Sequence, residues 1–327
     1  MSGAKPDVLL VGHRKPTIVD GLAGQVNLHV LNDAPDRDAL LRSLADKAQA
    51  VAVTYMANKI DAAFMQALPK LEIVSSFGVG YDHIDARWAG EHGIVVTNTP
   101  EVLNEEVADT AVGLLISTIR EFPQAERYLR AGKWPEKAFR LSKATLRDRT
   151  IGMVGMGRIG RAIAHRLEAF GAPVVYHSRR PADGVSYRYY PDLIEMARDV
   201  DVLMLIVPGG AGTHNMVGKA VLEALGPDGI VINVARGSVI DEPALIDALR
   251  RGTILSAGLD VFPNEPHVNP DLLMLDNVVL LPHIASGSEY TRRAMDQLVV
   301  DNILAWAAGK APLTPVAETP WPPQRRS

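Results

Sequence analysis

Three ionisable side chains in the second half of the chain each follow a short apolar run, and together they could reduce a carbonyl group. They are Arg236 in Ile232-Asn-Val-Ala-Arg-Gly-Ser238, Glu265 in Asp260-Val-Phe-Pro-Asn-Glu-Pro266, and His283 in Leu281-Pro-His-Ile-Ala-Ser-Gly287. A guanidinium offers a planar fork for a carboxylate and for a developing oxyanion. A glutamate beside a histidine would hold the imidazole and raise its pKa, so that it donates a proton near neutral pH.

Each of the three residues also has a plain structural explanation. Taken singly, Arg236 is equally well explained as the cap of a turn, Glu265 as an exposed loop acid, and His283 as a structural hydrogen-bond donor. Their position favours the catalytic interpretation, because parallel α/β sheets bind ligands at the carboxyl ends of their strands. All three residues follow predicted strands, downstream of a dinucleotide-binding motif.

That motif is the glycine-rich segment Thr150-Ile-Gly-Met-Val-Gly155-Met-Gly157-Arg-Ile-Gly160, a strand that runs into G-x-G-x-x-G. The glycines permit a tight turn, a close approach of a pyrophosphate to backbone N–H groups, and close packing of helix on strand. The phosphates would lie at the positive N-terminus of the following helix. Apolar residues continue that helix at a helical spacing, which predicts a buried face of Ile159, Ile163, Leu167 and Phe170.

A basic turn follows the next predicted strand, where an NAD-specific site usually carries an acidic residue. Ser178 lies 23 residues after Gly155 (178 − 155) and is followed by Arg179 and Arg180. A carboxylate would repel a 2′-phosphate, whereas a hydroxyl and a guanidinium can bind one. The turn favours NADP(H) over NAD(H), with NAD(H) still possible and a merely solvated basic turn as the alternative.

Short β-branched runs alternate with helical patterns along almost the whole chain, which predicts an α/β fold with parallel sheets. The first predicted strands are Asp7–Val11, Val26–Val30, Ala50–Thr54, Glu72–Ser76 and Ile94–Thr97. The second series is Thr150–Gly155, Pro173–His177, Asp201–Val207, Gly229–Ala235, Ser256–Phe262 and Val278–Pro282. Predicted helices include Arg37–Ala48, Ala62–Ala67, Asn104–Arg120 with Asn104 as its cap, and Ser288–Ala308. The Pro-rich stretch Ala311–Ser327 is predicted to be an extended surface arm.

Composition narrows the class of protein. The 327 residues suggest about two domains, and 47% hydrophobic with 22% charged residues is typical of globular cores. A net charge of −4 argues against a general nucleic-acid binder. No cysteine is present, so thiolate chemistry is excluded, and no His/Asp/Glu spacing predicts a metal site. With no signal peptide or apolar run of membrane length, we expect a cytoplasmic protein that binds no membrane.

These motifs resemble those of the D-isomer-specific 2-hydroxyacid dehydrogenases, and within them the glyoxylate/hydroxypyruvate reductase branch. The resemblance covers nearly the whole chain. It rests on Leu71-Glu-Ile-Val-Ser-Ser-Phe-Gly-Val-Gly-Tyr-Asp-His-Ile-Asp85, the glycine fingerprint, Asn233-Val-Ala-Arg-Gly-Ser238, Gly258-Leu-Asp-Val-Phe262 and Leu281-Pro-His-Ile-Ala-Ser286. The Ser-Arg-Arg turn is similar to that of NADPH-preferring members, including plant hydroxyphenylpyruvate reductases.

The resemblance implies a role for each matched residue. Arg236 would bind the substrate carboxylate and carbonyl oxygen, His283 would be the general acid/base, and Glu265 would be its partner. The backbone N–H groups of Val79 and Gly80 would hold the carboxylate. The cofactor-binding positions expected from the motifs and the resemblance are Val79, Thr110, Gly155, Gly157, Arg158, Ile159, Gly160, Ser178, Arg179, Arg180, Val207, Pro208, Thr213, Val234, Ala235, Arg236, Asp260, His283, Ala285 and Ser286, with Asp260 near the nicotinamide amide.

Two segments depart from the pattern of this branch. Tyr55 and Met56 stand where smaller or polar residues are expected, which predicts an altered substrate pocket lined by these two side chains. Gly209-Gly-Ala-Gly212 replaces a polar loop after a cofactor-domain strand. A bulkier substrate such as hydroxyphenylpyruvate is therefore one alternative. Phosphoglycerate dehydrogenase is a less favoured alternative, because we expect no extra regulatory domain and the cofactor turn is basic. A dinucleotide-sensing corepressor that binds protein partners is an alternative from a different class of function.

The resemblance also implies the architecture. Residues 1–100 and 287–327 would form a substrate-binding domain, and residues 101–286 an inserted dinucleotide-binding Rossmann domain. The fold class is two Rossmann-like or flavodoxin-like domains with the active site in the cleft between them. We further expect a homodimer formed through the long Asn104–Arg120 helix and the arm after it. Phe64, Leu129 and Trp134 are expected in the core or the dimer contact rather than at the substrate.

Overall fold

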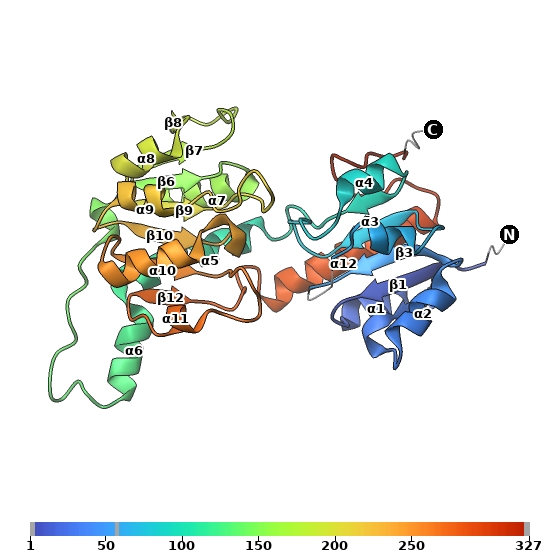
Figure 1. Ribbon diagram of the computed structural model, residues 1–327, viewed down its shortest axis with the longest axis horizontal. Coiled ribbons are helices and arrows are strands. Elements are labelled where there is room, and N and C mark those ends of the chain that lie inside the picture. The colour runs from blue at the N-terminus through green and yellow to red at the C-terminus, as the bar shows by residue number, and fades with distance from the viewer. Residues whose placement is uncertain (1–3, 56–58, 324–327) are drawn as a thin grey trace. The chain divides into compact units, whose positions relative to one another are not determined.

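The computed structural model describes residues 4–55 and 59–323, and the chain divides into two compact units. Unit 1 is Met1–Leu103 with Ser288–Ser327, and unit 2 is Asn104–Gly287. The chain thus changes units after Leu103 and after Gly287, where the sequence placed the changes after residues 100 and 286. The inserted arrangement of one domain within another is visible from these bounds (Figure 1). The predicted cleft between the domains stays a prediction.

Unit 1 contains a five-stranded parallel sheet in the order β2-β1-β3-β4-β5, the flavodoxin-like order. Its strands are β1 (Asp7–Val11), β2 (Asn27–Val30), β3 (Ala48–Val53), β4 (Ile73–Ser76) and β5 (Val95–Thr97). Its helices are α1 (Pro16–Leu22), α2 (Arg37–Leu44), α3 (Ala62–Gln66), α4 (Ala86–Glu91) and α12 (Glu289–Ala307). The inner strands β1, β3 and β4 are buried except at Asp7 and Gln49, as expected for a sheet covered on both faces.

Unit 2 contains a seven-stranded parallel sheet in the order β12-β11-β10-β9-β6-β7-β8. Its strands are β6 (Ile151–Val154), β7 (Val174–His177), β8 (Arg188–Tyr190), β9 (Val202–Leu205), β10 (Ile230–Asn233), β11 (Ser256–Leu259) and β12 (Val278–Leu280). Its helices are α5 (Asn104–Arg120), α6 (Phe122–Arg130), α7 (Arg158–Glu168), α8 (Leu193–Asp199), α9 (Lys219–Leu225), α10 (Glu242–Arg251) and α11 (Pro270–Leu273). The strand order reverses between β6 and β9, which is the switch point where such sheets bind ligands.

The predicted two-domain α/β class is confirmed, but several local predictions were wrong. The sequence missed β8 entirely, since its Arg-Tyr-Tyr carries too little of an apolar run. The helix predicted to continue to Ala48 ends at Leu44, because Ala48 begins β3. Asn104 is the first residue of α5 rather than its cap. Phe170 lies beyond the end of α7 and is 46% exposed, while Ile163 and Leu167 form the buried face.

Four predicted strands, those corresponding to β9, β10, β11 and β12, end two or three residues too late. The residues lost from them, such as those after β9, β10 and β11, form the turns at the carboxyl edge of the sheet. Apolar character continues after β10 and β11 because Val234, Ala235, Val261 and Phe262 are buried there without being paired in the sheet. Among the described residues, no helix is long and apolar enough to cross a membrane.

The C-terminal tail is not a free surface arm. Residues 311–323 pack along β5, where Pro315 pairs with Thr97 in an antiparallel bridge and Val316 donates its N–H to the Val96 carbonyl oxygen. Val316 and Thr319 are buried. A tail that supplies hydrogen bonds to the edge strand of the sheet is a structural part of unit 1.

Candidate active site

The glycine loop after β6 has the geometry that the fingerprint predicts. Gly155 has a φ of +104°, and a Cβ there would lie 2.5 Å from the Ile206 carbonyl oxygen. A Cβ on Gly160 would lie 2.5 Å from the Gly155 carbonyl oxygen, so this glycine permits α7 to pack on the strand. Gly157 precedes α7 and faces open space. The loop therefore leaves the N-terminus of α7, which begins with Arg158 and Ile159, accessible to a phosphate.

The basic turn after β7 is exposed. Ser178 accepts a hydrogen bond from the Tyr189 hydroxyl on its carbonyl oxygen, at 3.2 Å, and its own hydroxyl donates to the Arg180 carbonyl oxygen at 2.6 Å. Arg179 and Arg180 are exposed beyond that turn. The turn is thus closed by its own side chain and presents two guanidinium groups to solvent, which is the charge that a 2′-phosphate needs.

Arg236 lies in a tight turn after β10. The buried Asn233 fixes this turn, because its amide donates to the Arg236 carbonyl oxygen at 3.0 Å and its Oδ1 accepts from the Ala235 N–H at 3.0 Å. The next residue, Gly237, passes against the segment after β11, where a Cβ would lie 1.9 Å from the Phe262 carbonyl carbon. Val234 and Ala235 are buried and Arg236 is half-buried. The turn therefore holds the guanidinium beside the segment that carries Glu265.

Glu265 and His283 form a direct pair. The Glu265 Oε2 lies 2.6 Å from His283 Nδ1, and Glu265 Oε1 accepts a hydrogen bond from the Phe262 N–H at 2.9 Å. With Nδ1 engaged by the carboxylate, Nε2 is the ring nitrogen that can exchange a proton with a ligand. The His283 side chain is 46% exposed, so it is open to a ligand. The pair expected from the sequence is present in the structure.

Electrostatics keep Glu265 ionised. Burial raises the pKa of its carboxyl group, and the hydrogen bond and charge of His283 act against burial. The Phe262 N–H and the charge of Arg236 lower the pKa further, so the net shift is downward from the usual value. Glu265 is therefore a carboxylate that orients the ring, rather than an acid that gives up a proton itself.

Asp260 holds the loop that carries His283. Its two carboxylate oxygens accept from the Ile284 and Ala285 N–H groups at 2.7 and 2.9 Å, and its carbonyl oxygen accepts from the His283 N–H at 2.8 Å. His283 itself has a φ of +53°, an uncommon conformation that these bonds maintain. Burial raises the pKa of Asp260, and the two N–H groups offset only part of this rise.

Further expected cofactor positions lie in neighbouring turns of unit 2. The Thr110 hydroxyl on α5 donates to the Ala285 carbonyl oxygen at 3.1 Å, which ties α5 to the turn containing Ser286. The Thr213 hydroxyl donates to the Pro208 carbonyl oxygen at 2.6 Å and closes the glycine-rich loop after Val207. Thr213 follows β9 and Ala285 follows β12, so these two residues come after strand ends on the same edge as the glycine loop.

The substrate-loop residues belong to unit 1 and follow β4. Val79 and Gly80 are partly buried, and the Val79 carbonyl oxygen accepts a hydrogen bond from the Asn98 side chain at 2.8 Å. Tyr55 follows β3 and is 48% exposed, with its ring 5.2 Å from that of His13. Met56 lies outside the described residues. Phe64 packs against the unit 1 core.

A buried charge pair beside this loop was missed by the sequence reasoning. The Lys15 Nζ lies 3.0 Å from an oxygen of Asp296 and 3.9 Å from the centroid of the Phe77 ring. Burial raises the pKa of Asp296, and the nearby Lys15 and Arg292 offset only part of this rise. The two ends of the pair are 281 positions apart (296 − 15), so no local pattern announces them. In the part of the chain that the structure describes, no group of three or more His, Asp and Glu side chains could hold a metal ion.

The comparisons with known proteins bear on this geometry. Residues 112–285 match the model of the D-isomer specific 2-hydroxyacid dehydrogenase NAD-binding domain, which covers unit 2 almost completely. The chain belongs to the D-isomer-specific 2-hydroxyacid dehydrogenase family. This membership confirms the resemblance drawn from the motifs and makes the chain an oxidoreductase of that family.

Two curated members of this dehydrogenase family illustrate its range. The chain is 43% identical over 309 residues to glyoxylate/hydroxypyruvate reductase A of Arabidopsis thaliana, covering 94% of this chain and 98% of that protein. It is 45% identical over 256 residues to hydroxyphenylpyruvate reductase of Plectranthus scutellarioides, covering 78% and 82%.

A solved structure extends the similarity to the whole fold. The NADPH-dependent glyoxylate/hydroxypyruvate reductase of Sinorhizobium meliloti, crystallised with NADP and malonate, is 49% identical with a TM-score of 0.90. The match covers 99% of both chains. The dehydrogenase fold therefore extends over both units.

Proposed function

We propose that this dehydrogenase reduces a short 2-oxo acid, glyoxylate or hydroxypyruvate, to the D-2-hydroxy acid with NADPH. The observation that carries this proposal is the Glu265–His283 pair, 2.6 Å apart, at the sheet edge that also carries Arg236 and the glycine loop. The named relatives from Arabidopsis thaliana and Sinorhizobium meliloti support the choice of substrate and of NADPH. The protein is proposed to act in the cytoplasm.

The cofactor fits the residues present. The open space at Gly157, the N-terminus of α7 and the exposed Arg179 and Arg180 suit a dinucleotide that carries an additional phosphate. When bound, NADPH supplies the hydride for the carbonyl carbon. The residues expected to hold it are those of the glycine loop, the basic turn, and the turns after β9, β10 and β12.

The chain's own groups account for the rest of the reaction. Arg236 is proposed to bind the substrate carboxylate and the carbonyl oxygen, and the Val79 and Gly80 N–H groups to bind the same carboxylate. His283 donates a proton to the oxygen that becomes a hydroxyl, while Glu265 keeps the ring oriented and stabilises its charge. General acid catalysis of this kind contributes typically about 10²–10⁴-fold in rate.

A bulkier 2-oxo acid remains the second candidate. The exposed ring of Tyr55 lies at the end of β3, and the relative from Plectranthus scutellarioides is named a hydroxyphenylpyruvate reductase. The experiment is steady-state kinetics on glyoxylate, hydroxypyruvate and hydroxyphenylpyruvate, each with NADPH and with NADH. The proposal expects the highest kcat/KM for a short acid with NADPH. A preference for hydroxyphenylpyruvate would replace it with the second candidate, and no turnover of any 2-oxo acid would reject both.

We also propose that the chain forms a homodimer through α5 and the arm after it, which consists of α6 and the segment that follows α6. Figure 1 shows this arm of unit 2 extending away from the sheet. No residue of α6 is buried, and Phe122, Leu129 and Trp134 are 49%, 57% and 65% exposed. Exposed apolar side chains gathered on this helix and the segment after it are costly to leave in water. Sedimentation analysis should give twice the chain mass, and Leu129→Lys with Trp134→Lys should give the monomer mass.

A further inference from the structure

The direction of two peptide N–H groups in the substrate loop is set by hydrogen bonds to the opposite side of the same peptides. The Gly78 carbonyl oxygen accepts from the Thr99 N–H at 2.9 Å, and the Val79 carbonyl oxygen accepts from the Asn98 side chain at 2.8 Å. In a trans peptide the N–H points opposite to the C=O. Fixing these carbonyl groups therefore fixes the Val79 and Gly80 N–H groups, the two donors proposed for the substrate carboxylate.

Asn98 is held in turn by the C-terminal tail. The Thr314 hydroxyl donates to the Asn98 carbonyl oxygen at 2.6 Å, and the Asn98 N–H donates to the Thr314 carbonyl oxygen at 3.3 Å. Thr314 is anchored to α12, because its N–H donates to Oδ1 of the fully buried Asn302 at 3.0 Å. The tail thus connects a buried helix to the residue that orients the substrate loop.

The same tail contacts the loop directly through a second residue. Tyr81 is the residue after Gly80, and its hydroxyl donates to Oε2 of Glu318 at 2.9 Å. Burial, the hydrogen bond and the Glu318 charge together raise the pKa of Tyr81 to about 12. The phenol is therefore a neutral donor at any ordinary pH, and the bond does not depend on titration near neutrality.

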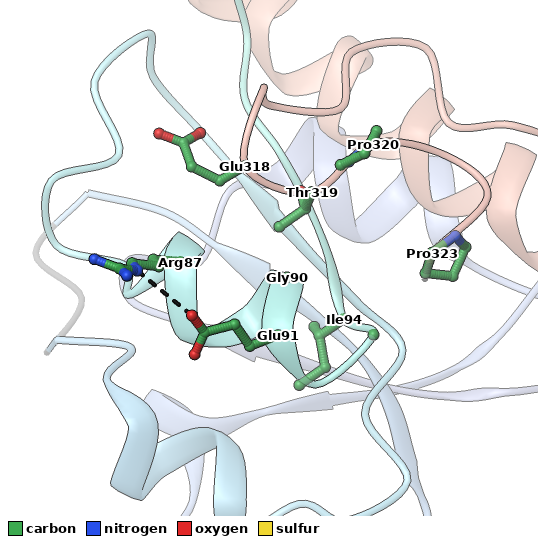
Figure 2. Close-up of a pocket in the computed structure, with 9 residues that line it drawn as sticks. Arg87, Gly90, Glu91, Ile94, Glu318, Thr319, Pro320 and Pro323 are labelled. Atoms are coloured by element: carbon green, nitrogen blue, oxygen red, sulfur yellow. Dashed lines mark ion pairs between the residues drawn. The ribbon is translucent and has the colours of Figure 1, made fainter. Parts of the chain in front are cut away.

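The backbone around Glu318 is placed by a glycine on α4. A Cβ on Gly90 would lie 2.3 Å from the Glu318 carbonyl oxygen, so an alanine cannot fit unless the tail moves. Glycine is a poor residue inside a helix, and its presence here permits the close approach. Figure 2 shows Glu318 and Thr319 beside α4, with Arg87 and Glu91 paired on that helix. Thr319 fixes the tail further by bonding the Val96 N–H and carbonyl oxygen at 2.8 and 3.1 Å.

We propose that the tail, residues 311–323, positions the 78–81 loop for binding of the substrate carboxylate, with Glu318 and Thr314 as positioning residues. This inference rests on the proposed function of the loop. A role in binding the carboxylate predicts which kinetic constant changes when the loop is disturbed. A loop that binds the carboxylate equally in the ground state and the transition state affects KM and leaves kcat nearly unchanged.

The test is steady-state kinetics of Glu318→Ala, Tyr81→Phe and Gly90→Ala with the preferred 2-oxo acid. Each variant is expected to raise KM for the 2-oxo acid about threefold to tenfold, with kcat changed less than about twofold and KM for NADPH unchanged. The double variant Tyr81→Phe with Glu318→Ala should be no worse than either single variant, because both remove one bond. Glu318→Gln should restore a KM near the wild-type value, since the amide oxygen still accepts from Tyr81.

The control is Glu91→Gln, because Glu91 and Glu318 both line a pocket of about 310 Å³ between α4 and the tail, while Glu91 pairs with Arg87 on its own helix. It should leave both constants unchanged. Glu318 is exposed, so its truncation opens no enclosed void. An unchanged KM for the 2-oxo acid in Glu318→Ala and Tyr81→Phe would overturn the inference. A loss of kcat and of NADPH binding as large as the change in that KM would overturn it as well.

An activity-independent measurement separates this inference from the proposed function. Amide hydrogen exchange at Val79 and Gly80 should be faster in Glu318→Ala than in the wild type, and unchanged in Glu91→Gln. If the wild type reduces no 2-oxo acid but exchange responds as stated, the proposed function fails and the structural role of the tail stands. If exchange does not respond, the tail does not order the loop, whatever the activity.

Discussion

In unit 2 the Arg236, Glu265 and His283 segments are supported by neighbours about three to 25 positions away, whereas in unit 1 the support of the 78–81 loop extends to residues at the far end of the chain. Asn233 orients the Arg236 turn and the Phe262 N–H binds Glu265, each across three positions. Tyr81 and Glu318 are 237 positions apart, and Asn98 and Thr314 are 216 apart. Both sheets are parallel and present residues at their strand ends, so topology alone does not produce this difference.

The difference follows from how the chain is threaded. Unit 2 is one continuous segment, so a turn between two adjacent elements can supply both a functional residue and its support. Unit 1 is completed only when α12 and the tail return to it, and its loop after β4 takes support from that last segment. We infer that unit 2 carries the chemical step and that unit 1 contributes binding. The predictions below test that division.

The largest effect is expected from His283→Ala. Removing the only proposed proton donor should lower kcat by about 10²–10⁴-fold, with the affinity for NADPH retained because the glycine loop and basic turn are untouched. Steady-state kinetics and a fluorescence titration with NADPH measure the two quantities. His267→Ala, an exposed histidine nearby, is the control and should retain activity. A fully active His283→Ala variant would contradict the assignment of the chemical step to unit 2.

The second-largest effect is expected from Arg236→Lys. Lysine keeps the charge but lacks the planar fork that binds a carboxylate and an oxyanion together. We expect kcat/KM for the 2-oxo acid to fall by about 10²–10³-fold, within the range for loss of one oxyanion donor. A fall of less than about threefold would show that charge alone suffices and that the turn set by Asn233 does not control the reaction.

A smaller effect is expected from Arg179→Ala with Arg180→Ala. Loss of charge-assisted bonds to the 2′-phosphate should lower kcat/KM with NADPH by about 10–100-fold, and with NADH by much less. Arg188→Ala, at an exposed position of β8, should leave the ratio unchanged. Equal losses with both cofactors would mean that the basic turn does not select the phosphate.

The smallest effect concerns stability and pH. Because the pKa of Glu265 in the folded chain is lowered, its contribution to stability is fully present above the unfolded value of about 4.3 and is lost as pH falls through the folded pKa. Glu265→Gln removes this contribution. The difference in urea unfolding between wild type and variant should therefore be largest above the unfolded pKa of about 4.3 and shrink as the pH is lowered below it. A gap that widens on acidification would contradict the stated sign.

The sequence was informative where a functional residue and the residues that orient it lie close together in the chain. The glycine fingerprint, the Arg236 segment and the strand ends carrying Glu265 and His283 could be read directly, because each motif contains the residues that shape its own turn. Asp260 was expected only near the cofactor, yet its carboxylate holds the His283 loop across 24 positions. Lys15 with Asp296, and Tyr81 with Glu318, left no local pattern, since a bond between distant segments depends on the completed fold. Asn98 and Thr99 follow β5, and the rule of strand ends could have identified them.

The most direct test of the division between the units is to measure kcat and KM for the 2-oxo acid side by side in His283→Ala and Glu318→Ala. We predict that His283→Ala loses kcat by at least about 10²-fold, while Glu318→Ala raises KM and keeps kcat within about twofold. If the two variants lose kcat to a similar degree, or if His283→Ala changes KM alone, the assignment of chemistry to unit 2 and binding to unit 1 is wrong.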